Sequence, residues 1–125
     1  MSDRVLLLLC AAHSFGFAAF HLGFWKVFAW REELPRMSVA NRAILQISNL
    51  RLIYVFLGVG ALCLTFPEEL VQTALGNAFL LGMAGFWLGR LVEQFVLLPY
   101  HRLAIHALSA LFALGVVVFA WPAMR

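Results

Sequence analysis

The sequence predicts an all-α integral membrane protein, an up-down-up-down bundle of four transmembrane helices. Hydrophobic residues make up 64% of the 125 residues and charged residues only 12%, and the mean hydropathy is +0.93. Soluble domains have a clearly lower apolar share. The apolar residues also form four runs, each close to the roughly 20 residues that cross a hydrocarbon core about 30 Å thick.

The predicted helices cover residues 5–28, 43–66, 73–98 and 103–121. We expect the first to be retained, because its apolar residues continue without a small-residue site at which a signal peptide is cleaved. The second includes "NRAILQISNLRLIYVFLGVGALCL", the third carries "GMAGFWLG", and the fourth lies between Pro99 and Pro122. The short proline-containing connections make neighbouring helices antiparallel, and we expect residues 1–125 to form one domain.

The distribution of basic residues predicts the orientation. They gather in the first and third connections, at Lys26, Arg31, Arg36, Arg42 and Arg102. The opposite side has fewer and also carries acidic residues, namely Arg4, Arg125, Glu68 and Glu69. By the positive-inside rule, loops one and three face the cytoplasm and both termini face outside. These scattered charges form no basic stripe, so we expect no nucleic-acid partner.

Polar residues from all four helices fall at similar predicted depth in the cytoplasmic half. At 1.5 Å rise per residue, the layer lies roughly 6 to 14 Å from the helix ends. Its members are His21, Gln46, Asn49, Arg51, Arg90, Glu93, Gln94 and His106. An arginine near the centre of a span costs about 2.5 to 3.5 kcal/mol, so intramembrane charges usually face inward and pair. We therefore expect this layer to bind a small anionic or amphiphilic ligand.

Within the layer, Arg51 and Arg90 would supply charge, Glu93 would fix one arginine, and the amides and imidazoles would orient the ligand. A structural alternative is an i, i+3 ion pair between Arg90 and Glu93, with Arg51 extending towards the headgroups. Arg51 lies about 160 degrees around the helix from Asn49, so it cannot share the face that Asn49 forms with Gln46.

Two cofactor alternatives stay open. His21 and His106 could face each other as axial ligands of a b-type haem, and the aromatic run "HSFGFAAFHLGFWKVFAW" could line a quinone. Neither His13 with His21 nor His101 with His106 has the helical spacing of a metal-ligand pair, so we expect no metal site. Hydrolase and phosphate-loop motifs are not found, and the sequence leaves open whether the protein is an enzyme.

Small residues on the third helix indicate close packing. Gly82, Gly85 and Gly89 share one face, and the last two form a GxxxG pair. This face could pack within the bundle or form a homodimer, and the homodimer could be a small transporter or channel. An accessory subunit of a membrane complex is a further alternative. We expect Cys10 and Cys63, which lie in apolar runs, to be buried and inert.

The segment "NRAILQISNLRLIYVFLGVGAL", followed by a glycine-rich third helix, resembles the small four-helix bacterial inner-membrane proteins grouped as DoxX-like or as families of unknown function. In motif the resemblance rests on Gln46, Asn49, Tyr54 and "FLGVG". It implies a multi-pass protein of the bacterial inner membrane and, in some members, association with quinone or redox systems. Only the architecture is carried over, because the first helix has His13 and His21 where several such groups have a histidine and a glutamate.

Overall fold

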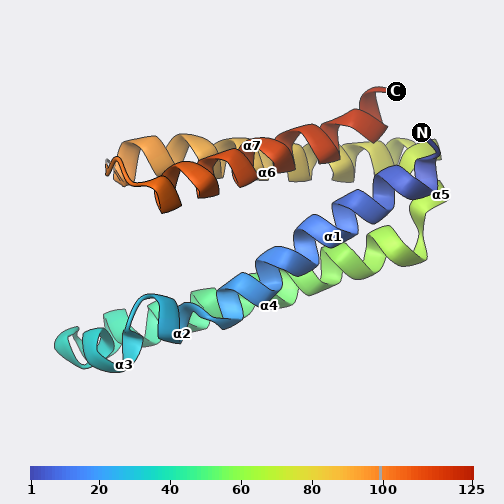
Figure 1. The fold of residues 1–125 in the computed structure, drawn as a ribbon. Helices are drawn as coiled ribbons and strands as arrows, with labels where there is room; N and C mark the ends of the chain where they lie inside the picture. The colour runs from blue at the N-terminus through green and yellow to red at the C-terminus, as the bar shows by residue number, and fades with distance from the viewer. Residues whose placement is uncertain (99) are drawn as a thin grey trace. The chain divides into compact units, whose positions relative to one another are not determined.

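The computed structural model describes residues 1–98 and 100–125 and is helical, with no strand among these residues (Figure 1). The elements are α1 (Asp3–Leu22), α2 (Phe24–Val27), α3 (Trp30–Glu33), the 3-10 helix η1 (Leu34–Arg36), α4 (Val39–Thr65), α5 (Pro67–Gln72), α6 (Ala74–Leu97) and α7 (Leu103–Met124). In the described part of the chain, α1, α4, α6 and α7 are long and apolar enough to cross a membrane. The predicted all-α class with four membrane-spanning helices is confirmed, and the chain is a multi-pass membrane protein.

Several helices begin or end a few residues away from the approximate boundaries that the sequence predicted. The first span ends at Leu22 rather than at residue 28, because the chain turns at Gly23 and again at Ala29, which adopts a left-handed conformation with φ 51°. The second begins at Val39, before the predicted residue 43. The connection expected between the second and third spans contains the short helix α5.

The fourth span also extends beyond its predicted end at residue 121, because Pro122 lies inside α7. A proline has no N–H for the carbonyl four residues earlier, so the carbonyl of Val118 loses its helical donor. The thiol of Cys10 replaces that donor, with its Sγ 3.1 Å from the Val118 oxygen. In membrane helices such side-chain donors allow an internal proline.

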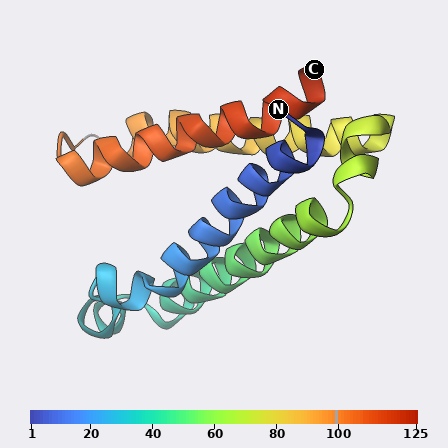
Figure 2. The ribbon, with the colours of Figure 1, turned by 45° about the vertical axis from the view of Figure 1, so that its right-hand side comes forward.

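The chain forms two compact units, residues 1–10 with 63–125 and residues 11–62, here called unit 1 and unit 2. The main element of unit 1 is the antiparallel pair of α6 and α7, which lie side by side in both views (Figures 1 and 2). The indole of Trp87 stacks on Phe112, with ring centroids 5.8 Å apart. Leu80 and Phe119 are fully buried.

A tight corner joins α5 to α6 in unit 1. The hydroxyl of Thr73 accepts a hydrogen bond from the Gly76 N–H at 2.9 Å and donates one to the Glu69 carbonyl at 2.7 Å. Thr73 is thereby the N-cap of α6. A Cβ on Gly76 would overlap the backbone of Leu70, so the corner needs a glycine there.

In unit 2, the second half of α1 runs antiparallel to α4. Three contacts define the direction, since the residue number falls on one helix as it rises on the other: His21 with Asn49, Phe17 with Phe56, and Phe15 with Gly60. A Cβ on Gly60 would lie 2.7 Å from the Phe15 ring. Because Gly60 has no side chain, the Phe15 ring can pack directly against the backbone of α4.

Candidate functional site

The members of the predicted polar layer divide equally between the units. His21, Gln46, Asn49 and Arg51 belong to unit 2, and Arg90, Glu93, Gln94 and His106 belong to unit 1. Each group is described by itself. The haem alternative requires His21 and His106 to face each other across the units, and this pairing stays a prediction.

In unit 2, His21 and Asn49 are joined by two hydrogen bonds. The imidazole Nδ1 of His21 lies 2.8 Å from the Asn49 Oδ1, and the Asn49 Nδ2 donates to the His21 carbonyl at 3.0 Å. The first contact requires Nδ1 to carry the proton, because an amide oxygen can only accept. Asn49 is 4% exposed, so its amide is satisfied within the protein and ties the end of α1 to α4.

Aromatic rings surround this imidazole. His21 stacks on Phe24, with ring centroids 4.1 Å apart and an interplanar angle of 26°, and meets Phe56 edge-on at 5.2 Å and Phe20 at 6.0 Å. Edge-to-face and stacked arrangements of this kind are favourable and directional. They fix the ring plane of His21, and with the Asn49 contact they indicate a role in holding unit 2 together.

Gln46 makes the second polar connection of unit 2. Its Oε1 accepts a hydrogen bond from the indole Nε1 of Trp25 at 3.2 Å, and its Nε2 donates to the Arg42 carbonyl at 3.2 Å. Gln46 and Asn49 thus use the same face of α4, as their spacing predicted. Both amides fix the segment that contains the end of α1 and α2.

Arg51 is not part of that cluster. It is exposed, and its guanidinium carbon lies 5.4 Å from the centroid of the Tyr54 ring on the same helix. The prediction that Arg51 cannot share the face of Asn49 is confirmed. In a membrane, an arginine in this position can extend its charged group towards the interface while its stem stays in apolar surroundings.

Unit 1 contains a small pocket between the end of α6 and the start of α7. Its volume is about 150 Å³, and it is lined by Gln94, Phe95, Leu98, Tyr100, His101, Ile105 and His106. Gln94 is 1% exposed and its Nε2 donates to the Ile105 carbonyl at 3.4 Å. Its Oε1 is buried and has no hydrogen-bond partner among the described residues. A residue that lines the pocket therefore has a buried acceptor without a hydrogen bond among the described residues.

Two imidazoles are among the groups that line this pocket. The rings of His101 and His106 are stacked with centroids 5.9 Å apart and an interplanar angle of 29°. The predicted site contained His106 but not His101, and the helical spacing of the two was considered only for a metal site. Since α7 begins only at Leu103, His101 lies before the helix and can approach His106. The proline and short connection before residue 103 were the signal that the helical angle does not apply there.

Arg90 contacts an aromatic ring rather than the predicted carboxylate. Its guanidinium carbon lies 4.5 Å from the centroid of the Phe112 ring, which favours a cation–π interaction. Glu93 is exposed. In residues 1–98 and 100–125 the salt bridges are Arg36 with Glu33 and Arg125 with Asp3, so the i, i+3 pair expected for Arg90 and Glu93 is not formed.

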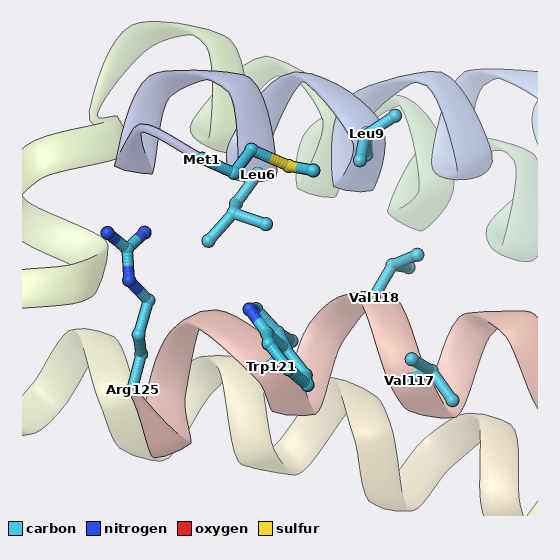
Figure 3. Close-up of a pocket in the computed structure, with 7 residues that line it drawn as sticks. All are labelled: Met1, Leu6, Leu9, Val117, Val118, Trp121 and Arg125. Atoms are coloured by element: carbon cyan, nitrogen blue, oxygen red, sulfur yellow. The ribbon is translucent and has the colours of Figure 1, made fainter.

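A larger groove in unit 1 is apolar. Its volume is about 380 Å³, and its lining residues come from the start of α1 and the end of α7: Met1, Leu6, Leu9, Val117, Val118, Trp121 and Arg125 (Figure 3). The guanidinium of Arg125 points across it towards α1 and binds Asp3 at 2.9 Å. The indole of Trp121 adds a second polar group to a lining that is otherwise apolar.

The glycine face of α6 lies away from the Trp87 and Phe112 core. A Cβ built on Gly82, Gly85 or Gly89 would meet nothing within 4 Å in the described structure. Close packing of this face against a second helix or a second copy stays a prediction. Nor do the described residues contain a group of three or more His, Cys, Asp and Glu side chains that could hold a metal ion.

No protein-family model, curated protein or solved structure matches this chain. The resemblance to the DoxX-like proteins therefore stays a prediction.

Proposed function

We propose that this chain is a multi-pass protein of the bacterial inner membrane that binds a small amphiphilic molecule in the Gln94 pocket. The observation that carries the proposal is the unpartnered Oε1 of the buried Gln94. A buried polar atom without a hydrogen bond costs about 1 to 3 kcal/mol. Such atoms are rare in native proteins, and a bound group is one common reason for them.

The chemistry of the pocket specifies what the molecule carries. An amide oxygen accepts hydrogen bonds, so the group that satisfies it is an O–H or N–H donor. The imidazoles of His101 and His106 offer a second polar contact, and Phe95, Leu98 and Ile105 supply apolar walls. No arginine or lysine is among the lining residues. Of the two ligand classes expected from the sequence, the amphiphile is therefore better supported than the anion.

The size of the pocket supports the same conclusion. A volume of about 150 Å³ is below the roughly 300 to 1,000 Å³ usual for sites that enclose a whole ligand. A hydroxyl-bearing ring or short polar head would fill it, with an apolar tail extending into the bilayer. The pocket lies at the end of α6 next to Arg102, and the basic connections favour the cytoplasmic side for this end.

Binding can be tested with 4-hexylphenol and its methyl ether, 4-hexylanisole, which differ in the hydroxyl donor. Equilibrium dialysis against protein-containing and empty nanodiscs separates binding from partition into lipid. We expect the phenol to bind wild-type protein about tenfold more tightly than the ether, since one hydrogen bond is worth about 1.4 kcal/mol at that ratio. Gln94→Leu should abolish the difference between the probes.

Gln72→Leu is the matched control, because Gln72 is exposed on α5 and lies outside the pocket. Its preference for the phenol should equal that of wild type. Equal binding of the two probes to wild type, or an unchanged preference in Gln94→Leu, would disprove the proposal. In that case an ordered water on Gln94 would explain its buried oxygen.

A further inference from the structure

The segment between α1 and α4 lies at the depth of the lipid headgroups. α1 has 20 residues, which corresponds to about 30 Å at 1.5 Å per residue, the thickness of the hydrocarbon core. Residues 23–38 begin where that length ends. The segment is rich in tryptophan and basic residues, a composition typical of membrane interfaces. It is therefore expected to contact phosphates and other headgroup atoms directly.

Aromatic contacts and one hydrogen bond give this segment a fixed form. Trp25 meets Trp30 edge-on with centroids 5.1 Å apart, and Phe24 meets Trp30 at 5.8 Å and Phe28 at 4.8 Å. The indole of Trp25 is also bonded to Gln46 of α4. Ala29, with its left-handed backbone, reverses the chain between α2 and α3. These contacts fix the backbone from which the charged side chains of the segment extend.

Beside these rings lies a hollow of about 430 Å³, here called the Trp25 hollow. It is lined by Trp25, Lys26, Ala29, Arg31 and Glu32. In the part of the chain that the structure describes, the salt bridge of this segment joins Arg36 to Glu33, and none of the three charged lining residues takes part in one. The hollow therefore offers two cations and one carboxylate without ion-pair partners.

We infer that the Trp25 hollow binds a phospholipid headgroup that carries a protonated amine, the chemistry of phosphatidylethanolamine. The phosphate interacts with Lys26 and Arg31, as phosphates commonly do with these side chains. The ammonium interacts with the carboxylate of Glu32. A purely anionic headgroup lacks a partner for Glu32, and a trimethylated amine has no N–H to donate to it. This site is in unit 2 and is independent of the Gln94 pocket.

The test uses the full chain in nanodiscs made of equal amounts of phosphatidylethanolamine, phosphatidylglycerol and phosphatidylcholine. Native mass spectrometry of released protein identifies the lipids that stay bound. We expect phosphatidylethanolamine to be enriched over both others on wild-type protein. The double variant Lys26→Gln/Arg31→Gln should lose roughly fivefold or more of that enrichment, given the usual contribution of a basic residue at the headgroup level.

Two single variants test the role of the carboxylate and provide a control. Glu32→Gln should shift the preference to phosphatidylglycerol, because the carboxylate that repels it and attracts the amine is gone. Arg36→Gln is the control, since Arg36 is paired with Glu33 and is not a lining residue. It should keep the wild-type preference. Bound lipid that follows the bulk composition, or a preference unchanged in the double variant, would overturn the inference.

The last part of the test uses a soluble headgroup as a competitor. Glycerophosphoethanolamine, which lacks acyl chains, should not displace the bound lipid at equal concentration, since the acyl chains hold the lipid at the hollow. If the protein instead binds glycerophosphoethanolamine and shows no enrichment of any lipid, the hollow serves a free phosphate compound, and the inference is overturned. Loss of 4-hexylphenol binding would concern the Gln94 pocket and leave these outcomes unchanged.

Discussion

The thiol of Cys10 occupies the place of the backbone N–H that Pro122 lacks. Its Sγ lies 3.1 Å from the carbonyl of Val118, four residues before the proline in α7. This relationship gives Cys10 a specific role in unit 1: it completes the hydrogen bonding of a helix that would otherwise end or bend. From the sequence, only a buried and inert cysteine is expected at this position.

Replacing Cys10 should therefore destabilise unit 1, by an amount that depends on Pro122. We expect Cys10→Ala to lower the free energy of unfolding in mixed micelles by about 0.6 kcal/mol and by no more than about 1.7 kcal/mol, the mean and the maximum measured for hydrogen bonds between membrane helices. Cys10→Ser, which keeps a donor, should cost less. In a Pro122→Ala background the helix regains its own N–H donor, so Cys10→Ala should cost little. An equal cost in both backgrounds would show that packing, not the thiol donor, explains the effect.

The pair of His21 and Asn49 predicts a second stability effect. Asn49→Leu removes the two hydrogen bonds that Asn49 makes with His21, one with the imidazole and one with the carbonyl. We expect a loss of about 1 to 3 kcal/mol in the free energy of unfolding, followed by circular dichroism. Asn41→Leu is the matched control on the same helix, since Asn41 is exposed. If the two variants lose the same stability, the pair contributes nothing specific.

Gly76 and Gly82 lie on the same helix and should respond in opposite ways to alanine. Gly76→Ala forces a methyl group against the backbone of Leu70 and should destabilise the corner of α5 and α6 by about 1 to 3 kcal/mol. Gly82→Ala meets nothing within 4 Å and should leave stability equal or raise it by up to about 1 kcal/mol through helix propensity. Thermal unfolding of the two variants side by side checks this. A neutral Gly76→Ala would disprove the close approach.

A double-mutant cycle tests the contact of Arg90 with Phe112. Arg90→Met and Phe112→Leu each alter packing, but the cycle isolates the interaction between the two side chains. We expect a coupling of about 0.5 to 2 kcal/mol, since the pair is partly buried and centred at 4.5 Å. The same cycle on Arg51 and Tyr54, which are exposed and 5.4 Å apart, should give a smaller value. Equal couplings would mean that burial does not strengthen the contact.

Hydropathy was sufficient to predict the four spans, because crossing a bilayer imposes a length and a composition on each helix separately. Helix ends were harder to predict. The break at Gly23 and the left-handed Ala29 lie in a segment that is still apolar and aromatic, so hydropathy does not distinguish them from a continuing helix. Glycine is also frequent inside membrane helices, and alanine is not a turn residue. The proline inside α7 depends on a thiol more than a hundred residues away in sequence, which no local pattern contains.

The sequence predicted the helix face of the polar residues better than it predicted their contact partners. Gln46 and Asn49 share a face of α4, and Arg51 lies off it, as helical geometry requires. Partners depend on which helices meet, and this is why Asn49 was not matched to His21 or Arg90 to Phe112. His101 was missed because its position relative to His106 depends on a connection rather than on a helix.

The corner at Gly76 also bears on evolution. Any related chain that keeps α5 folded back on α6 must keep a residue without a side chain three positions after the threonine that caps α6. A relative with a larger residue there would need to lengthen, shift or lose α5. The threonine-x-x-glycine spacing at the start of the third span is thus a steric requirement of this corner.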